Sequence, residues 1–363
     1  MAYLTVTEVE SGLSALANTY PALTSLVTLP SDTHEGRTCH ALRIGAGAAG
    51  TKDGILFIGG VHAREWGSCE ICINFAADIL EAFTRGTGLV YGGKSFTANQ
   101  VRAIVEGLHV FVFPLVNPDG RHHSQTVVPM WRRNRNPADS GGNPDCVGVD
   151  INRNYDWLWD FPNKFSPDAI VRVSTDPCEL ELSGEPGTGT YHGSSPFSEA
   201  ETKNVRWLLD TYPSIRWLVD LHSHSELILH PWGDDQVQTT DPSMNFMNPA
   251  YDTARGEVND AYGEYIPGAD LTAVTDVANR MRDAIQAVRG KNYTVQSGFE
   301  LYATAGTGSD YVYSQHFADP GIFKVHGFTI EWGTEFQPPW DEMERIILDI
   351  TAALIEFCLP ASR

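Results

Sequence analysis

The sequence predicts an α/β fold in which one domain, residues 1–363, has a central, mixed and mostly parallel β-sheet flanked by helices. Short apolar runs typical of buried strands alternate along the chain with longer segments whose apolar residues recur with helical period. The chain is long enough to bury a large core, and no internal repeat, linker or low-complexity tract divides it. Strands that alternate with helices are typical of sheets whose faces are covered by those helices.

Each predicted strand is a short run of apolar and β-branched residues. In chain order these runs are around Leu26–Leu29 and Cys39–Ile44, then Ile55–Ile58, Val110–Val116, Arg216–Leu221 and Gly327–Ile330. The polar segment 31–36 supplies the turn between the first two runs. Asn117–Gly120 is a strong turn signal, and we expect it to end the fourth strand.

The predicted helices are amphipathic segments that lie between these strands. In chain order they are Val6–Leu16, Trp66–Phe83, a helix that starts near Ser198, Leu271–Val288 and about Asp341–Cys358. Glu201 lies three residues after Ser198, which is the spacing of a capping box. By contrast, residues 117–196 are polar, rich in Gly, Pro and Asn and largely without periodicity. Irregular stretches of this length inside a compact domain are usually functional.

The overall charge restricts the classes of partner. A formal net charge of −21 argues against nucleic acid and anionic membrane surfaces, and it favours cationic over anionic substrates at short range. No apolar run reaches the length needed to span a bilayer. The first residues lack the basic region and apolar core of a signal peptide, so we expect none in this chain and slightly favour the cytoplasm.

Polar residues that can hold a metal lie at the ends of predicted strands. His62 and Glu65 follow the strand Ile55–Ile58 and are three residues apart, so both side chains can reach one ion. This spacing alone is weak evidence, because a capped turn with a surface His and Glu explains it equally well. His222 follows another strand, but His224 shares its face in an extended segment, so spacing does not choose between them.

Glu331 follows the last predicted strand. Ligands of open α/β sheets bind outside the carboxyl ends of the strands, so His62, Glu65, a histidine at 222 or 224, and Glu331 are expected to meet there. Two histidines and one glutamate with an open fourth position are a ligand pattern of zinc peptidases. Glu331 is then the carboxylate left to activate a water molecule.

The chain contains six cysteines, of which Cys69 and Cys72 form a Cys-x-x-Cys pattern. No second pair accompanies it, and it lies within the predicted helix Trp66–Phe83 among apolar residues. We therefore expect buried free thiols and not a redox or metal site.

Several further motifs are spread along almost the whole chain. They are His62–Trp66, Asn117–Gly120, Met130–Arg133, Cys146–Asn154, Tyr191–Gly193, Pro196–Glu199, the segment at His222, Tyr302 and Phe328–Glu331. Together they resemble the motifs of zinc carboxypeptidases of the carboxypeptidase A type, the funnelin family. The two N-terminal strands match only loosely.

The resemblance implies a metal site and a catalytic pair. One zinc ion is held by His62, Glu65 and His222, which decides against His224, and Asp150 orients the first histidine. Glu331 aligns with the general base of the family. Arg132 aligns with the arginine that polarises the scissile carbonyl and binds the oxyanion.

The resemblance also implies a substrate site. Asn152 and Arg153 align with the pair that grips the terminal carboxylate of the substrate, and Tyr302 aligns with a mobile tyrosine that closes over it. Arg64 is a further substrate-binding residue. Ser309 stands at the floor of the pocket for the C-terminal side chain, where members that prefer basic residues carry an acid.

The expected function is therefore a zinc-dependent exopeptidase, a monomer without propeptide that acts on peptides with a free C-terminus and prefers neutral or hydrophobic C-terminal residues. The alternative is a related zinc amidohydrolase or cell-wall peptide peptidase on the same fold. Cys146 and Cys178 align with a disulfide pair of secreted members, and such a bridge indicates an oxidising compartment. The acidic insertion at 234–269 could shape the rim of the site or hold calcium.

Overall fold

Eight strands form the central sheet in the order β1-β2-β6-β3-β7-β12-β8-β11 in the computed structural model, which describes residues 3–48, 50–180 and 187–361. The strands are β1 (Thr24–Thr28), β2 (His40–Ile44), β3 (Gly54–Gly59), β6 (His109–Phe113), β7 (Ile215–His222), β8 (Leu227–His230), β11 (Thr294–Ser297) and β12 (His326–Glu331). The central strands β6, β3, β7 and β12 run parallel to one another. Antiparallel pairings join β1, β2 and β8 to them, and β11 is parallel to β8, so the predicted mixed sheet is confirmed.

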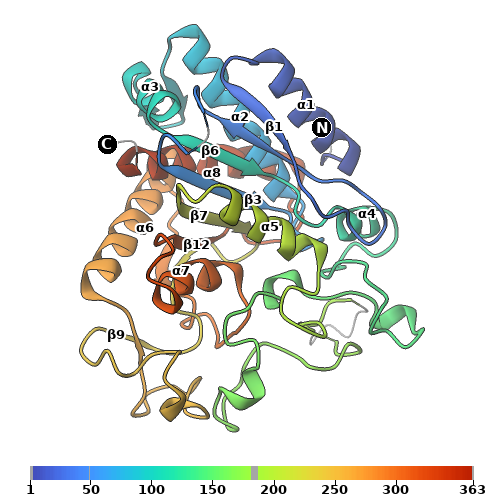
Figure 1. Cartoon of the computed structure of the whole chain (residues 1–363). Coiled ribbons are helices and arrows are strands. Elements are labelled where there is room, and N and C mark those ends of the chain that lie inside the picture. Colours follow the sequence, from blue (N-terminus) through green and yellow to red (C-terminus); the bar gives the residue numbers. More distant parts are fainter. Residues whose placement is uncertain (1–2, 49, 181–186, 362–363) are drawn as a thin grey trace.

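Helices cover both faces of this sheet (Figure 1). They are α1 (Val6–Thr19), α2 (Gly67–Arg85), α3 (Ala98–Gly107), α4 (Pro118–Thr126), α5 (Ala200–Thr211), α6 (Gly268–Arg289), α7 (Gly308–Ala318) and α8 (Trp340–Ala361). Short 3₁₀ turns are η1 (Pro144–Cys146), η2 (Ile151–Arg153), η3 (Phe161–Asn163) and η4 (Pro249–Tyr251). Two small sheets lie outside the central one, namely β4 (Leu89–Tyr91) with β5 (Lys94–Phe96), and β9 (Val237–Gln238) with β10 (Glu264–Tyr265).

Two cores lie on the two faces of the sheet. Successive side chains of a strand point to opposite faces, and in β3 the side chains of Ile55 and Phe57 join one core while those of Leu56 and Ile58 join the other. The first core takes its helical residues mainly from α2, α3, α6 and α8, and the second takes them from α5 and α7. Burial on both faces explains why β3 has no polar residue between Gly54 and Gly59.

The structure corrects two local predictions. Asn117–Gly120 does not form an isolated turn but starts α4, because Asn117 accepts a hydrogen bond from the Gly120 amide as N-cap and Pro118 occupies the first helical position. The capping box at Ser198 is absent. Helix α5 begins at Ala200 after Glu199, and the Ser198 hydroxyl donates to the Glu199 side chain at 2.6 Å instead.

Sequence reasoning also missed helix α7. Its residues Gly308 and Asp310–Ser314 are all buried, so its apolar residues do not follow a single stripe of helical period. Among the described residues no helix is both long and apolar enough to cross a bilayer.

Glu201, in the first turn of α5, provides a test of how burial affects stability. Its side chain is buried beside Glu199, and burial raises its pKa to about 8. A carboxyl group whose pKa is higher in the folded than in the unfolded protein lowers the stability of the fold as pH rises. The loss takes place between the pKa of the unfolded state and the pKa of the folded state. We predict that Glu201→Gln removes this dependence. Between pH 5 and 8 the free energy of unfolding of wild type should then fall, relative to that of the variant, by about 1 kcal/mol per pH unit.

Urea unfolding at each pH measures this difference. The exposed Glu106→Gln variant is the matched control and should track wild type at every pH. If the difference in free energy of unfolding between wild type and Glu201→Gln were the same at every pH, the pKa of Glu201 would not be elevated.

Candidate active site

The first two site residues lie on the turn that connects β3 to α2. The chain reverses at Gly60, where φ is +61° and an added Cβ would lie 2.9 Å from Leu115 Cδ1, so glycine is required there. The Glu65 amide donates to the His62 carbonyl at 3.2 Å and closes the turn. As a result His62 Nδ1 lies 2.8 Å from Glu65 Oε1, and both side chains are buried.

The neighbouring strands deliver the next two residues to the same edge of the sheet. His222 is the last residue of β7, which lies between β3 and β12, and Glu331 is the last residue of β12. The register pairs Glu331 directly with His222. His222 Nδ1 lies 2.9 Å from Glu65 Oε2 and 2.9 Å from His62 Nδ1. His62 and Glu65, which follow β3, therefore converge on one point with His222, which ends the adjacent parallel strand β7.

The arrangement of the two histidines fits a bound cation. His62 Nε2 lies 3.1 Å from Asp150 Oδ1, and His222 Nε2 lies 2.8 Å from Asp220 Oδ2. A carboxylate beside each Nε2 favours the ring proton there, so that both Nδ1 atoms and the Glu65 carboxylate face one point as possible ligands. Three such groups repel one another unless a proton or a metal cation lies between them. Although burial opposes it, the charges of Asp220 and Glu65 raise the pKa of His222 well above its usual value, so this ring holds a proton when no metal is bound. A nitrogen and carboxylate set of this kind suits zinc.

Only these three residues form such a group within the part of the chain that the structure describes. Their ligand atoms lie within 4.8 Å of one another. His224, the alternative ligand, is exposed and packs edge-on against Phe336 with ring centroids 4.7 Å apart. Asp220 was missed in the sequence, although it lies two residues before His222 and so on the same face of the strand.

Asp150 connects the histidine to an arginine. One oxygen, Oδ1, faces His62, while Oδ2 accepts hydrogen bonds from Nε of Arg132 at 2.9 Å and lies 2.9 Å from a terminal nitrogen of the same guanidinium. Burial alone would raise the pKa of Asp150, but the charges of Arg132 and His62 hold it well below its usual range. The carboxylate therefore stays ionised and fixes both partners.

Glu331 is partly buried next to this network. Burial raises its pKa to about 8, and the charge of His222 opposes that rise. A divalent cation between His62, Glu65 and His222 would also oppose that rise and bring the pKa of Glu331 down. The carboxylate would then be available as a base at neutral pH.

The pair Asn152 and Arg153 lies on the short turn η2, whose N-cap is Asp150. The Asn152 side chain accepts a hydrogen bond from the Gly308 amide at 2.9 Å, and Arg153 Nη1 donates to the Asn152 carbonyl at 2.6 Å. The Arg153 guanidinium lies 5.9 Å from the ring centre of Tyr302. Gly306 packs so closely that an added Cβ would lie 2.2 Å from the Arg153 carbonyl, so the loop after Tyr302 rests on the arginine.

A small cavity extends from these residues towards α7. Its lining includes Asn152, Arg153, Tyr302, Ser309 and Glu331. The structure thus places Ser309 with the other predicted substrate residues. The lining also contains Asp310, which sequence reasoning named only as a neighbour of Ser309.

Asp310 is buried and accepts a hydrogen bond from the Thr307 hydroxyl at 2.7 Å. Burial raises its pKa to about 7. The carboxyl faces Gly233, where an added Cβ would lie 2.8 Å from Oδ2. Arg64 lies apart from this group, with its guanidinium 4.1 Å from the centre of the Phe336 ring.

The sequence profile of the family described as "Zinc carboxypeptidase" matches residues 9–352, nearly the whole chain. The chain belongs to the zinc carboxypeptidase family.

Relatives within the family differ in how much of their length this chain matches. Metallocarboxypeptidase A of Trichophyton tonsurans is 33% identical over 205 residues, which is 55% of this chain but 40% of the fungal protein. Carboxypeptidase B of Astacus astacus is 29% identical over 307 residues, which is 84% of this chain and 79% of the other. The chain thus spans less than half the length of the fungal relative.

Solved structures share the fold. Carboxypeptidase A from Helicoverpa armigera superposes with a TM-score of 0.74 at 22% identity, covering 99% of this chain and 74% of the other. Bovine thrombin-activatable fibrinolysis inhibitor, in complex with tick carboxypeptidase inhibitor, gives a TM-score of 0.71 at 20% identity and covers 99% and 97%.

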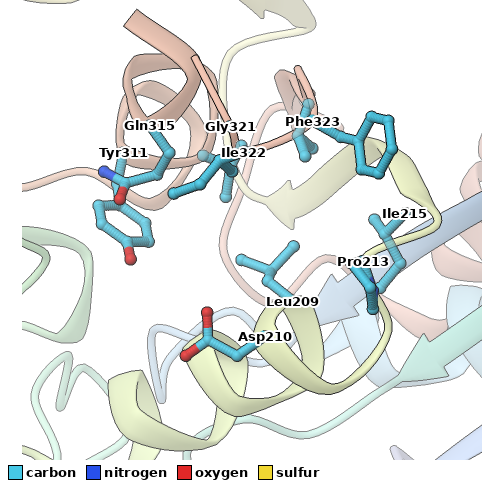
Figure 2. Close-up of a pocket in the computed structure, with 11 residues that line it drawn as sticks. Leu209, Asp210, Pro213, Ile215, Tyr311, Gln315, Gly321, Ile322 and Phe323 are labelled. Carbon is cyan, nitrogen blue, oxygen red and sulfur yellow. The ribbon is translucent and has the colours of Figure 1, made fainter. Parts of the chain in front are cut away.

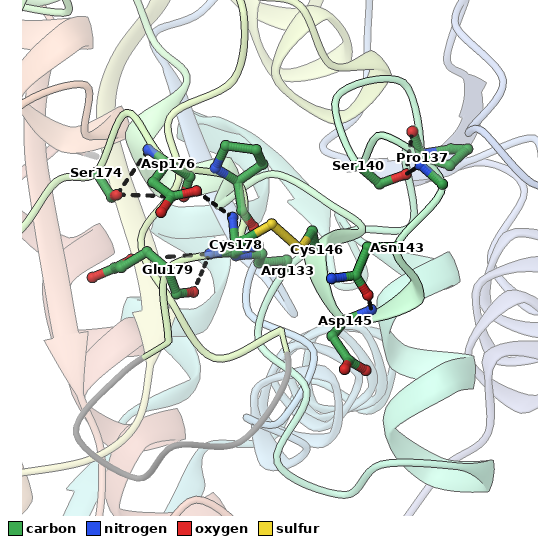
Figure 3. Close-up of a disulfide and its surroundings, with 12 residues drawn as sticks. Arg133, Pro137, Ser140, Asn143, Asp145, Cys146, Ser174, Asp176, Cys178 and Glu179 are labelled. Carbon is green, nitrogen blue, oxygen red and sulfur yellow. Dashed lines mark hydrogen bonds and ion pairs between the residues drawn. A yellow bond between two sulfur atoms is a disulfide. The ribbon is translucent and has the colours of Figure 1, made fainter.

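A disulfide holds the irregular region of this chain. Cys146 and Cys178 are bonded, as the resemblance implied (Figure 3). The segment that carries Cys178 surrounds Arg133, which donates to the carbonyls of Pro177 at 2.5 Å and Glu179 at 2.8 Å. The four other cysteines are free and buried, which confirms the prediction for Cys69 and Cys72.

The acidic insertion at 234–269 is organised around an arginine. Arg255 is fully buried, its Nη1 donates to Asp252 at 3.1 Å, and its Nε lies within 4 Å of both Asp234 and Glu264. The structure therefore places a cation of the protein itself among these carboxylates.

A separate apolar hollow lies between α5 and α7, lined by Leu209, Ile215 and Phe323, away from the predicted site residues (Figure 2).

Asp220 offers a test of the metal centre. Because its carboxylate fixes the proton of His222, we predict that Asp220→Asn weakens zinc retention about 10- to 100-fold. Competition between the protein and a chromophoric chelator measures this change without reference to activity. The exposed Asp210→Asn variant on α5 should retain zinc like wild type. Equal retention by the Asp220→Asn variant would show that Asp220 does not position the ligand.

Proposed function

We propose that this protein is a zinc-dependent exopeptidase that hydrolyses the C-terminal peptide bond of peptides. The observation that carries the proposal is the convergence of His62, Glu65 and His222, with both Nε2 atoms committed to carboxylates and both Nδ1 atoms turned inward. One zinc ion held by these residues would supply an activated water molecule and a Lewis acid for the scissile carbonyl.

Glu331 acts as the general base. It takes a proton from the attacking water at a carboxylate oxygen and later returns it to the nitrogen of the leaving amine. Its pairing with His222 across β12 and β7 holds it at the metal centre. Because the two strands are regular at this point, Glu331 needs little rearrangement before it acts.

Arg132 stabilises the oxyanion that forms when the carbonyl is attacked. A donor in such a position is worth about 2.7–4 kcal/mol of transition-state stabilisation. The two contacts between Arg132 and Asp150 orient the guanidinium before substrate binds. That orientation favours catalysis because little reorganisation is required as charge develops.

Recognition of the free C-terminus falls to Asn152 and Arg153, with Tyr302 over the bound end. A guanidinium fork matches a carboxylate in two hydrogen bonds, which an internal peptide bond cannot offer. The hydrogen bond from the Gly308 amide to Asn152 and the bond from Arg153 Nη1 to the Asn152 carbonyl fix this clamp. Arg64 contributes to substrate binding beside Phe336.

We assign the cavity that contains Ser309 to the C-terminal side chain of the substrate. Ser309 is neutral, and Leu229 and Leu301 add apolar surface to the lining. These features support a preference for neutral or hydrophobic C-terminal residues. The chain is expected to act as a monomer on peptides, without nucleic acid or membrane partners, given its net charge of −21. The disulfide supports an oxidising compartment over the cytoplasm.

Peptides with free and amidated C-termini test the proposal. We expect the metal-loaded enzyme to release the last residue from the free peptide only, and a chelator to abolish release. Arg153→Ala should lower kcat/KM on the free peptide about 10- to 100-fold, because a charged hydrogen bond is lost. The surface variant Arg206→Ala should behave like wild type.

The alternative, a zinc amidohydrolase or cell-wall peptide peptidase, makes a different prediction. For that activity Arg153→Ala would leave hydrolysis of acylated amino acids intact. Equal cleavage of free and amidated peptides by wild type would exclude an exopeptidase.

A further inference from the structure

A second cavity adjoins the one that contains Ser309 and is lined by three arginines. Arg132, Arg153 and Arg172 contribute to its wall together with His224 and Tyr302. It shares only Arg153 and Tyr302 with the first cavity, among the lining residues that the structure describes. The two cavities therefore meet where the terminal carboxylate is expected to bind.

Arg172 is fixed by its backbone in this wall. Its amide donates to the Ala303 carbonyl at 2.8 Å, and its own carbonyl accepts a hydrogen bond from Arg153 Nε at 2.6 Å. Val171 and Ala303 form a parallel β-bridge at the same place. The segment is thus held between the residue after Tyr302 and the arginine of the clamp, while the Arg172 side chain is exposed.

The charge of this cavity contrasts with that of the protein. The chain has a net charge of −21. In the described part of the cavity wall, however, three arginines are accompanied by one carboxylate, that of Glu179. Glu179 is already engaged, since its Oε2 accepts from the Thr190 amide at 2.7 Å and lies 3.9 Å from Arg133. A local positive site on an acidic protein selects anionic groups.

The three guanidinium groups differ in what neutralises them. Arg132 has Asp150 as its counter-charge, and under the proposed function Arg153 receives the terminal carboxylate of the substrate. No ion pair involves Arg172 within the described ranges. Arg172 is therefore the arginine of this wall that is left to pair with a second carboxylate of the substrate.

We propose that Arg172 forms a subsite for the side chain of an aspartate or glutamate that precedes the scissile bond, so that the enzyme prefers acidic residues on the acyl side. This inference rests on the proposed function. The acyl side follows from the geometry, because the released side chain has its own cavity at Ser309. Arg132, which acts on the scissile carbonyl, lines the second cavity and not the first.

The expected effect is moderate because Arg172 is exposed and water screens its charge. We expect kcat/KM for an acidic residue at the preferred position to exceed that for the neutral amide by about 3- to 10-fold. The gain should appear mainly in KM, because the same contact exists in the ground state and in the transition state. It should shrink at high ionic strength.

Blocked peptides that end in phenylalanine test the proposal, with Glu, Gln or Lys placed in turn at each of the three positions before the scissile bond. We expect the zinc enzyme at low salt to prefer Glu over Gln at one position and to disfavour Lys there. Arg172→Gln should abolish that preference, so that the ratio of kcat/KM for the Glu peptide to that for the Gln peptide falls to about one. Arg172→Lys should keep part of it, and Arg206→Gln should keep all of it.

Equal kcat/KM for Glu and Gln peptides at all three positions would overturn the subsite, as would a preference that survives in Arg172→Gln. Both outcomes leave the exopeptidase itself intact, because the Gln peptides are still cleaved. Failure to cleave any of the peptides, or cleavage that a chelator does not inhibit, would instead reject the proposed function. Thermal unfolding of each variant verifies that the fold is retained.

Discussion

Two imidazole nitrogens that lie 2.9 Å apart, Nδ1 of His62 and Nδ1 of His222, impose the main constraint on this molecule. Each ring has a carboxylate beside its opposite nitrogen, which favours the proton there and turns Nδ1 towards a shared cation. The Glu65 carboxylate faces the same space. Burying three electron-pair donors together is costly without a cation, and a sheet that holds them this way is organised to bind one.

The carboxylate of Asp150 carries this constraint to the substrate side. It contacts His62 through one oxygen and Arg132 through the other, and it also accepts the Asn152 amide at 3.0 Å as the N-cap of η2. A single buried carboxylate therefore fixes His62, Arg132 and the turn of Asn152 relative to one another, which are the residues proposed as metal ligand, oxyanion donor and terminal clamp. Loss of its charge would affect all three together, since each depends on the same two oxygens.

The residues at strand ends could be predicted from the pattern of the sequence, whereas loop residues such as Arg132, Arg153 and Tyr302 could be named only through the resemblance. His62, His222 and Glu331 follow strongly apolar runs, and the rule that sites form at the carboxyl ends of parallel strands brings them together. The contact between Arg172 and Ala303 joins two irregular segments far apart in the sequence, and no periodicity indicates it. The spacing of Asp220 from His222 places both side chains on one face of β7 and could have indicated their contact. Because the strand is buried on both faces, its residue pattern does not show which face Asp220 is on.

One connected unit is formed by Arg153, the loop that follows Tyr302, and the segment that carries Arg172. Arg153 donates to the Arg172 carbonyl, the Arg172 amide donates to Ala303 next to Tyr302, and Gly306 packs on the Arg153 backbone. Displacement of any one of these segments breaks a hydrogen bond or a close contact to another. Under the proposed function, a carboxylate bound at Arg153 would also stabilise the segment that carries Arg172, because the same guanidinium contacts both. We therefore expect recognition of the terminal residue and of the residues before it to be coupled through that side chain.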